Sequence, residues 1–187
     1  MSNNYKEKFI EIFTANIKRD GADKLLKFLE DSDFFKAPCS TKFHLCVEGG
    51  LVRHSLNVYN RLKTLATTES DETVAICGLL HDLCKVNFYV VDYRNAKNKQ
   101  GVWEKVPYYT VEDKLCYGHG EGSVFLISKF ISLTMEEAIA IRYHMGGFDE
   151  SIRGGNYSFG NAASMYPLCP KLICADLLST YIDEVEK

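Results

Sequence analysis

Apolar residues recur at helical spacing along most of this chain. Phe9, Phe13 and Ile17 follow one another every four residues, the separation that places side chains on one face of a helix. Similar patterns return further along the chain and predict helices over about 25–29, 51–65, 74–83, 121–130, 135–144 and 172–181. The chain is therefore expected to fold mainly as packed helices.

Two segments depart from this helical pattern. Residues 88–111 contain two runs rich in strand-favouring residues, Phe88–Tyr93 and Val102–Val106, on either side of a polar turn. They predict a β-hairpin inserted between helices. Residues 146–160 hold five glycines and are expected to form a long mobile loop.

The composition narrows the class of protein. A length of 187 residues with 46% hydrophobic residues is typical of one globular domain, here expected to span 1–187. No signal-peptide core follows Met1, and no apolar run reaches the roughly 18 residues of a membrane span. We therefore expect a cytoplasmic protein with its seven cysteines reduced and no membrane partner. The net charge of −3 argues against a dedicated nucleic-acid binder but allows a small anionic substrate.

The candidate chemistry centres on His81-Asp82, an adjacent imidazole and carboxylate at the end of an apolar helical run. Mixed nitrogen and carboxylate ligands suit the divalent transition metals Mn, Fe, Co, Ni and Zn, so one or two such ions are the expected cofactor. The full candidate ligand set is His54, His81, Asp82, His119, His144 and Asp176.

The spacing of the central pair suggests how two metals would share these ligands. Successive helical side chains point about 100° apart, so His81 and Asp82 meet at one centre only if the metal lies between them. A carboxylate bridge from Asp82 satisfies this geometry, with His54 and Asp176 on the first metal and His119 and His144 on the second. Two metals would activate a water for attack on phosphorus.

The motifs Gly49-Gly50-Leu51-Val52-Arg53-His54-Ser55, His81-Asp82-x-x-Lys85 and Asp176 resemble the HD-domain metal-dependent phosphohydrolase superfamily, over residues 37–180. Gly118-His119 and His144 look like its six-ligand branch, which includes cyclic-dinucleotide phosphodiesterases and the HD domain of bacterial exoribonucleases. The resemblance implies an all-α, phosphodiesterase-like helical bundle and a phosphate-facing Lys85. The Gly-Tyr-Pro of the cyclic-dinucleotide enzymes and the oligonucleotide-binding domain of the exoribonucleases are both missing, which leaves the substrate open.

We therefore predict a metal-dependent phosphohydrolase acting on a phosphomonoester or phosphodiester, of a nucleotide or a short oligonucleotide. Asp82 and Lys85 are the predicted catalytic residues, and His44 and Lys85 are predicted to contact the substrate. Two alternatives share these residues. One is an HD-type di-iron oxygenase, which uses the same ligand order, and the other is a non-catalytic nucleotide-binding sensor. Metal identity, ester class and oligomeric state stay open.

Overall fold

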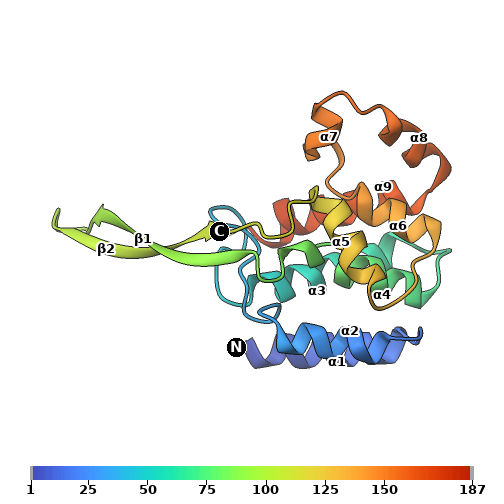
Figure 1. Cartoon of the computed structure of the whole chain (residues 1–187), viewed down its shortest axis with the longest axis horizontal. Coiled ribbons are helices and arrows are strands. Elements are labelled where there is room, and N and C mark those ends of the chain that lie inside the picture. The colour runs from blue at the N-terminus through green and yellow to red at the C-terminus, as the bar shows by residue number, and fades with distance from the viewer. Residues whose placement is uncertain (1, 186–187) are drawn as a thin grey trace.

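The computed structural model describes residues 2–185 as a body of helices from which one long β-hairpin projects (Figure 1). This is the all-α fold with an inserted hairpin that the sequence predicts. The longer helices of the body are α1 (Ser2–Asn16), α2 (Ala22–Asp31), α3 (Gly50–Leu65), α4 (Asp71–Leu80), α5 (His119–Ser128), α6 (Met135–Arg142), α8 (Ser158–Met165) and α9 (Leu168–Leu178). Shorter turns are η1 (Leu83–Lys85), η2 (Gly146–Phe148), α7 (Glu150–Arg153) and the π-helical η3 (Ser179–Asp183).

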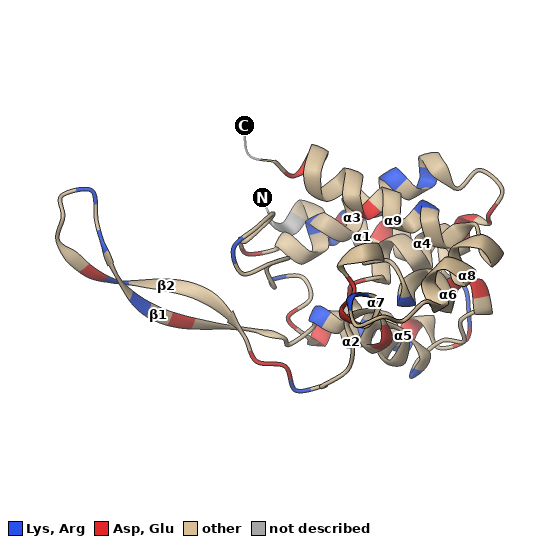
Figure 2. Ribbon diagram, turned by 90° about the horizontal axis from the view of Figure 1, so that it is seen from above, with Lys and Arg blue, Asp and Glu red and all other residues tan. Residues whose placement is uncertain are grey.

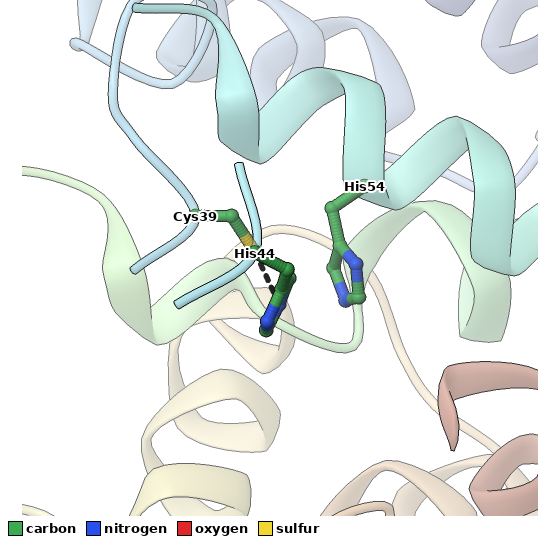
Figure 3. A group of neighbouring side chains, drawn as sticks. All are labelled: Cys39, His44 and His54. Atoms are coloured by element: carbon green, nitrogen blue, oxygen red, sulfur yellow. Dashed lines mark hydrogen bonds between the residues drawn. The ribbon is translucent and has the colours of Figure 1, made fainter. Parts of the chain in front are cut away.

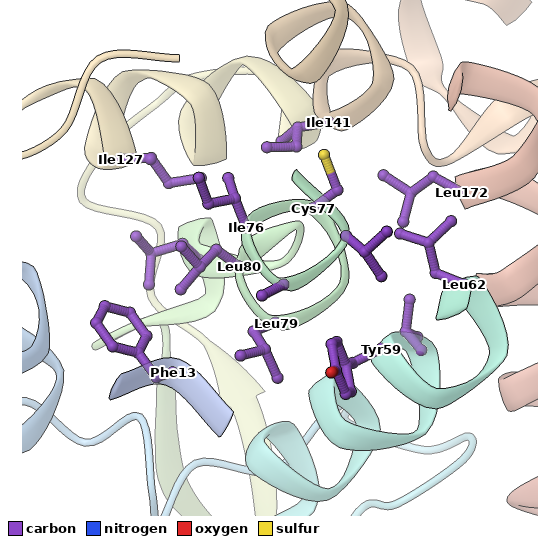
Figure 4. Packing of buried hydrophobic residues seen from close by; sticks show 14 of the residues in the cluster. Phe13, Tyr59, Leu62, Ile76, Cys77, Leu79, Leu80, Ile127, Ile141 and Leu172 are labelled. Carbon is purple, nitrogen blue, oxygen red and sulfur yellow. The ribbon is translucent and has the colours of Figure 1, made fainter. Parts of the chain in front are cut away.

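Helix α4 lies at the centre of the hydrophobic core (Figure 4). All of its residues from Val74 to Leu80 are buried, as expected for a helix that neighbours surround on every side. Its N-terminus is capped by Ser70, whose Oγ accepts a hydrogen bond from the backbone N–H of Thr73 at 3.1 Å. A Cβ atom on Gly78 would lie 2.6 Å from the Cα of Tyr59, so only glycine permits this approach of α3 to α4.

A buried ion pair joins the N-terminal segment to α6. The carboxylate of Glu137, which is fully buried, accepts hydrogen bonds from two guanidinium nitrogens of Arg19 at 2.6 and 2.7 Å. Glu137 also accepts from the Thr73 hydroxyl at 2.8 Å and forms a capping box with Thr134 at the start of α6. One carboxylate therefore connects α4 and α6 to the segment between α1 and α2.

The structure corrects two predicted elements. Helix α5 begins at His119, two residues before the predicted start, so this histidine is helical. The segment 146–160, predicted to be a mobile loop, contains η2, α7 and the start of α8. Its glycines suggested disorder, but the carboxylate of Asp149 caps α7 by accepting from the N–H groups of Ser151 and Ile152. A local cap therefore orders what glycine content alone would leave irregular.

The hairpin consists of β1 (Tyr89–Lys97) and β2 (Trp103–Val111), paired antiparallel from Tyr89 opposite Val111 to Lys97 opposite Trp103. Figures 1 and 2 show it reaching far beyond the helices. At its root, the hydroxyl of Tyr89 donates to the carbonyl of Cys39 at 2.8 Å. Further out, apolar side chains are exposed on the strands, including Tyr93 and Trp103.

Two further predictions concern the whole chain. Within residues 2–185, every helix is too short or too polar to cross a lipid bilayer. The seven cysteines are all free thiols in the structure.

Candidate metal centre

The structure brings all six predicted ligands into one cluster at the end of α4. The Nε2 atom of His54 lies 3.2 Å from Nε2 of His81 and 3.3 Å from Oδ1 of Asp176. The ring of His144 packs against that of His81, with 4.9 Å between their centroids. The six side chains come from different parts of the chain: His54 from α3, His81 and Asp82 from the end of α4, His119 from the start of α5, His144 from just beyond α6, and Asp176 from α9.

Asp82 lies at the middle of this cluster, and its two carboxylate oxygens face different histidines. Oδ1 lies 2.7 Å from Nε2 of His119 and 3.4 Å from Nε2 of His144. Oδ2 lies 3.6 Å from Nε2 of both His54 and His81. The carboxylate therefore lies between two pairs of imidazoles.

Backbone hydrogen bonds orient two of the imidazoles with Nε2 toward the cluster. Nδ1 of His144 donates to the carbonyl of Ile141 at 2.7 Å, and Nδ1 of His81 donates to the carbonyl of Gly78 at 3.1 Å. Because a carbonyl can only accept, both Nδ1 atoms carry the proton, and neutral rings then present the Nε2 lone pair to the site.

The buried Nε2 of His144 has no hydrogen-bond partner in the structure. A lone pair at that atom and the Oδ1 of Asp82, 3.4 Å away, are two acceptors facing each other, which is unfavourable unless a proton or a metal cation lies between them. Burial alone would lower the pKa of His144, but Asp82 outweighs that effect and raises it. The site therefore attracts positive charge, and its donor set fits a divalent transition metal.

Two other groups of the cluster, His81 and Asp82, hold charge states that suit metal binding. Burial lowers the pKa of His81 to about 3, so its ring is neutral. Burial would raise the pKa of Asp82, but the charge of Lys85 and the hydrogen bond with His119 outweigh this effect and hold it well below its usual range. Ligand atoms of His54, His81 and Asp176 lie within 4.8 Å of one another, as do those of His81, Asp82 and His144.

Comparison with known families agrees with this geometry. The family model of the HD domain matches residues 51–179, which is more than half of the chain and includes all six clustered residues. The chain belongs to the HD-domain family. HD domains are typically metal-dependent phosphohydrolases. No curated protein and no solved structure matched the chain.

Glycines allow the helices of this HD domain to place its histidines together. A Cβ atom on Gly120 would lie 2.1 Å from the carbonyl oxygen of Arg142, so α5 reaches α6 only with glycine there. This contact brings the ring of His119 to 5.3 Å from that of His144. The side chain of Arg142 is largely buried and forms an ion pair with Asp149 at 2.8 Å.

A carboxylate that sequence reasoning missed supports His54. Both oxygens of Glu184 lie 3.1 Å from Nδ1 of His54, and Asn57 donates to the same carboxylate at 2.8 Å. Glu184 is buried, although it follows η3 and lies outside the matched residues. By accepting the Nδ1 proton, it directs Nε2 of His54 into the cluster.

The segment before α3 brings Cys39 and His44 beside His54 (Figure 3). Sγ of Cys39 lies 3.3 Å from Nε2 of His44 and 3.6 Å from Nζ of Lys85. Burial would raise the pKa of Cys39, but positive charge at His54 and Lys85 outweighs it and lowers the value to about 7. A Cβ on Gly50 would lie 2.8 Å from the backbone nitrogen of Cys39, so the double glycine lets this segment approach the helix start.

A cavity of about 580 Å³ opens onto the cluster. Lys85 lines it and contacts Oδ2 of Asp82 at 2.6 Å. Burial would lower the pKa of Lys85, but the Asp82 carboxylate outweighs this effect and raises it well above normal, so the side chain stays charged. His44, predicted to contact substrate, also lines the cavity. The outer walls are apolar and aromatic, and their members include Phe43, Tyr89, Val111, Phe148, Leu177 and Tyr181.

Proposed function

We propose that this HD domain hydrolyses a phosphoester of a nucleotide or short oligonucleotide, using one or two divalent transition metals. The metal ligands in this proposal are His54, His81, Asp82, His119, His144 and Asp176. The observation that carries it is the buried Asp82, whose two oxygens face separate pairs of imidazoles. The buried and unpartnered Nε2 of His144 supports the same assignment.

Bound metal would supply a Lewis acid and lower the pKa of a coordinated water. The chain itself provides orientation and charge. Asp82 holds the imidazoles in place around it, and Glu184 fixes the ring of His54. Lys85 keeps its positive charge in the cavity, where it attracts a phosphate group and offsets negative charge that develops during ester cleavage.

The cavity supports a substrate that joins a phosphate to an aromatic group. Its inner end carries Lys85 and His44, which are suited to phosphate oxygens. Its outer walls include Phe43, Phe148 and Tyr181. The exposed fractions of these residues are 82%, 50% and 59%. Exposed aromatic side chains offer stacking surfaces to a nucleobase.

One preparation tests this function. The protein is stripped of metal, reconstituted separately with Mn, Fe, Co, Ni or Zn, and assayed against nucleotide monoesters and diesters. We expect bound metal and metal-dependent release of phosphate or nucleotide. Retained iron with oxygen consumption and no hydrolysis would identify an oxygenase instead. Nucleotide binding without turnover under every metal would identify a sensor.

The role of Glu184 provides a separate prediction. The Glu184→Ala variant is expected to bind metal about 10–100-fold more weakly, because the ring of His54 loses the acceptor that orients it. Isothermal titration calorimetry on metal-free protein measures the change. The neighbouring Asp183→Ala is the matched control, since Asp183 pairs with Arg61 at the surface and does not contact the cluster. Equal metal affinities for the two variants would exclude this role.

A further inference from the structure

The hairpin leaves both of its strand edges without a partner in the described structure. Its sheet has two strands, and it projects from the helices along most of its length (Figure 2). A two-stranded hairpin alone is marginally stable in water, and unpaired edges are templates for pairing with another chain. Residues 90–95 of β1 are all exposed. The strand edges are therefore candidate interaction surfaces.

Hydrogen bonds at the two ends of the hairpin determine which backbone groups face outward. The N–H of Glu112 donates to the carbonyl of Phe88, and the N–H of Asn98 donates to the carbonyl of Val102, both at 2.9 Å. In an antiparallel pair, hydrogen-bonded and non-hydrogen-bonded residue pairs alternate. The even-numbered residues of β1 therefore bond to β2. The outward N–H and C=O groups belong to residues 89, 91, 93, 95 and 97 of β1 and to 103, 105, 107, 109 and 111 of β2.

One of the two edges is interrupted by proline. Pro107 occupies an outward-facing position near the middle of β2, and proline has no N–H to donate to an added strand. β1 contains no proline, so each of its outward positions has both an N–H and a C=O. The N–H of Tyr93 donates to Oδ1 of Asp92 at 2.7 Å, a local bond that an added strand would replace. The edge open to pairing is therefore that of β1.

We propose that β1 pairs antiparallel with β1 of a second copy of this chain, about a two-fold axis at Tyr93. The result is a four-stranded sheet across a symmetric dimer. Tyr93 is the midpoint of Tyr89–Lys97, so this register pairs the whole strand, and it joins outward-facing residues to outward-facing residues. In the same register, Asp92 of each copy lies opposite Arg94 of the other.

The charges distinguish this register from its neighbours. An axis at residue 92 would place Asp92 opposite Asp92 of the second chain, and an axis at residue 94 would place Arg94 opposite Arg94. In either case, like charges would face each other. An axis at 91 or 95 would shorten the pairing and separate the two charges. Both side chains are already held on the sheet, because the hydroxyl of Tyr108 donates to Asp92 at 3.1 Å and Arg94 lies over the Tyr108 ring. Charge and strand length thus select the same pairing.

Charge reversal tests the proposal by light scattering or sedimentation. The wild-type protein is expected to show twice the 21.2 kDa mass of one chain. Asp92→Arg and Arg94→Asp should each be monomeric, because like charges then face each other. Mixing the two variants should restore a dimer, since both arginines of one chain face both aspartates of the other. A monomeric wild type, a single variant that stays dimeric, or a mixture that stays monomeric would overturn the proposal.

Proline substitution tests which edge is used. Tyr93→Pro removes an outward N–H from β1, which within the hairpin donates only to the side chain of Asp92, and Lys105→Pro removes one from β2. Neither substitution breaks a backbone hydrogen bond between the two strands. We expect Tyr93→Pro to be monomeric and Lys105→Pro to stay dimeric, with equal helical circular dichroism and melting temperature. A dimer that survives Tyr93→Pro, or that Lys105→Pro abolishes, would contradict pairing through β1.

Discussion

The Asp82→Asn variant is expected to lose metal binding and to lower turnover by about a thousandfold or more. The substitution keeps the shape of the side chain but replaces a carboxylate oxygen that faces imidazole nitrogens with an N–H₂ group. An amide nitrogen cannot bind a metal ion through a lone pair as the carboxylate does. Metal content and phosphoester hydrolysis measured on the same sample provide the readout.

Two comparison variants separate chemistry from folding in this experiment. Loss of the Asp82 charge leaves the ammonium group of Lys85 buried without its partner. The double variant Asp82→Asn with Lys85→Met removes this unpaired charge. Asp183→Asn is the surface control and should keep wild-type metal content and turnover. Wild-type turnover in Asp82→Asn would refute the proposed centre.

The Arg19→Ala variant is expected to lower the free energy of unfolding by about 3–5 kcal/mol, because it leaves a buried carboxylate without its cation. Glu137 is fully buried and would keep only the hydroxyl of Thr73 and the N–H of Thr134 as donors. Urea unfolding measures the change. Arg61→Ala is the matched control, since the exposed Arg61–Asp183 pair should contribute less than about 1 kcal/mol. Equal losses from the two variants would contradict the argument.

The same ion pair makes stability depend on pH. Burial would raise the pKa of Glu137, but hydrogen bonds from Arg19 outweigh it and lower the value below that of an ordinary glutamate. The unfolded chain therefore binds this proton more readily, so the stabilisation is present above the ordinary glutamate pKa and is lost as pH falls through the folded value. In Arg19→Ala, Glu137 loses the hydrogen bonds from Arg19 that lower its pKa, while burial still raises it. The difference in the free energy of unfolding between this variant and wild type should therefore become smaller in acid.

Periodicity and residue chemistry predicted much of this structure, because they depend on neighbouring residues. Helical spacing of apolar residues located α3, α4 and α9, and the strand-rich runs located the hairpin. The six clustered residues were predicted from ligand chemistry and family motifs, and they do converge. The start of α5 was misplaced because Gly118-His119-Gly120 has low helix propensity, and packing against α6 outweighs it.

Other features depend on contacts between distant segments, and no local pattern reports them. Glu184 supports His54 from 130 residues away, inside a short polar stretch that resembles any solvated chain end. From the sequence alone, Cys39 would be interpreted as a small buried hydrophobic residue. Only the fold shows that it lies beside Lys85. The ordering of 146–160 arises from the Asp149 cap and its bond to Arg142, a pairing across the end of α6.

The root of the hairpin has a consequence for the shape of the cavity. Tyr89 and Val111 face each other where the two strands leave the helical body, and both line the cavity above the clustered ligands. The insertion therefore supplies part of the cavity wall but none of the six predicted ligands. This part of the cavity wall and the ligand cluster therefore come from separate parts of this chain, so exchanging the hairpin would reshape the entrance and leave the six side chains beneath it in place.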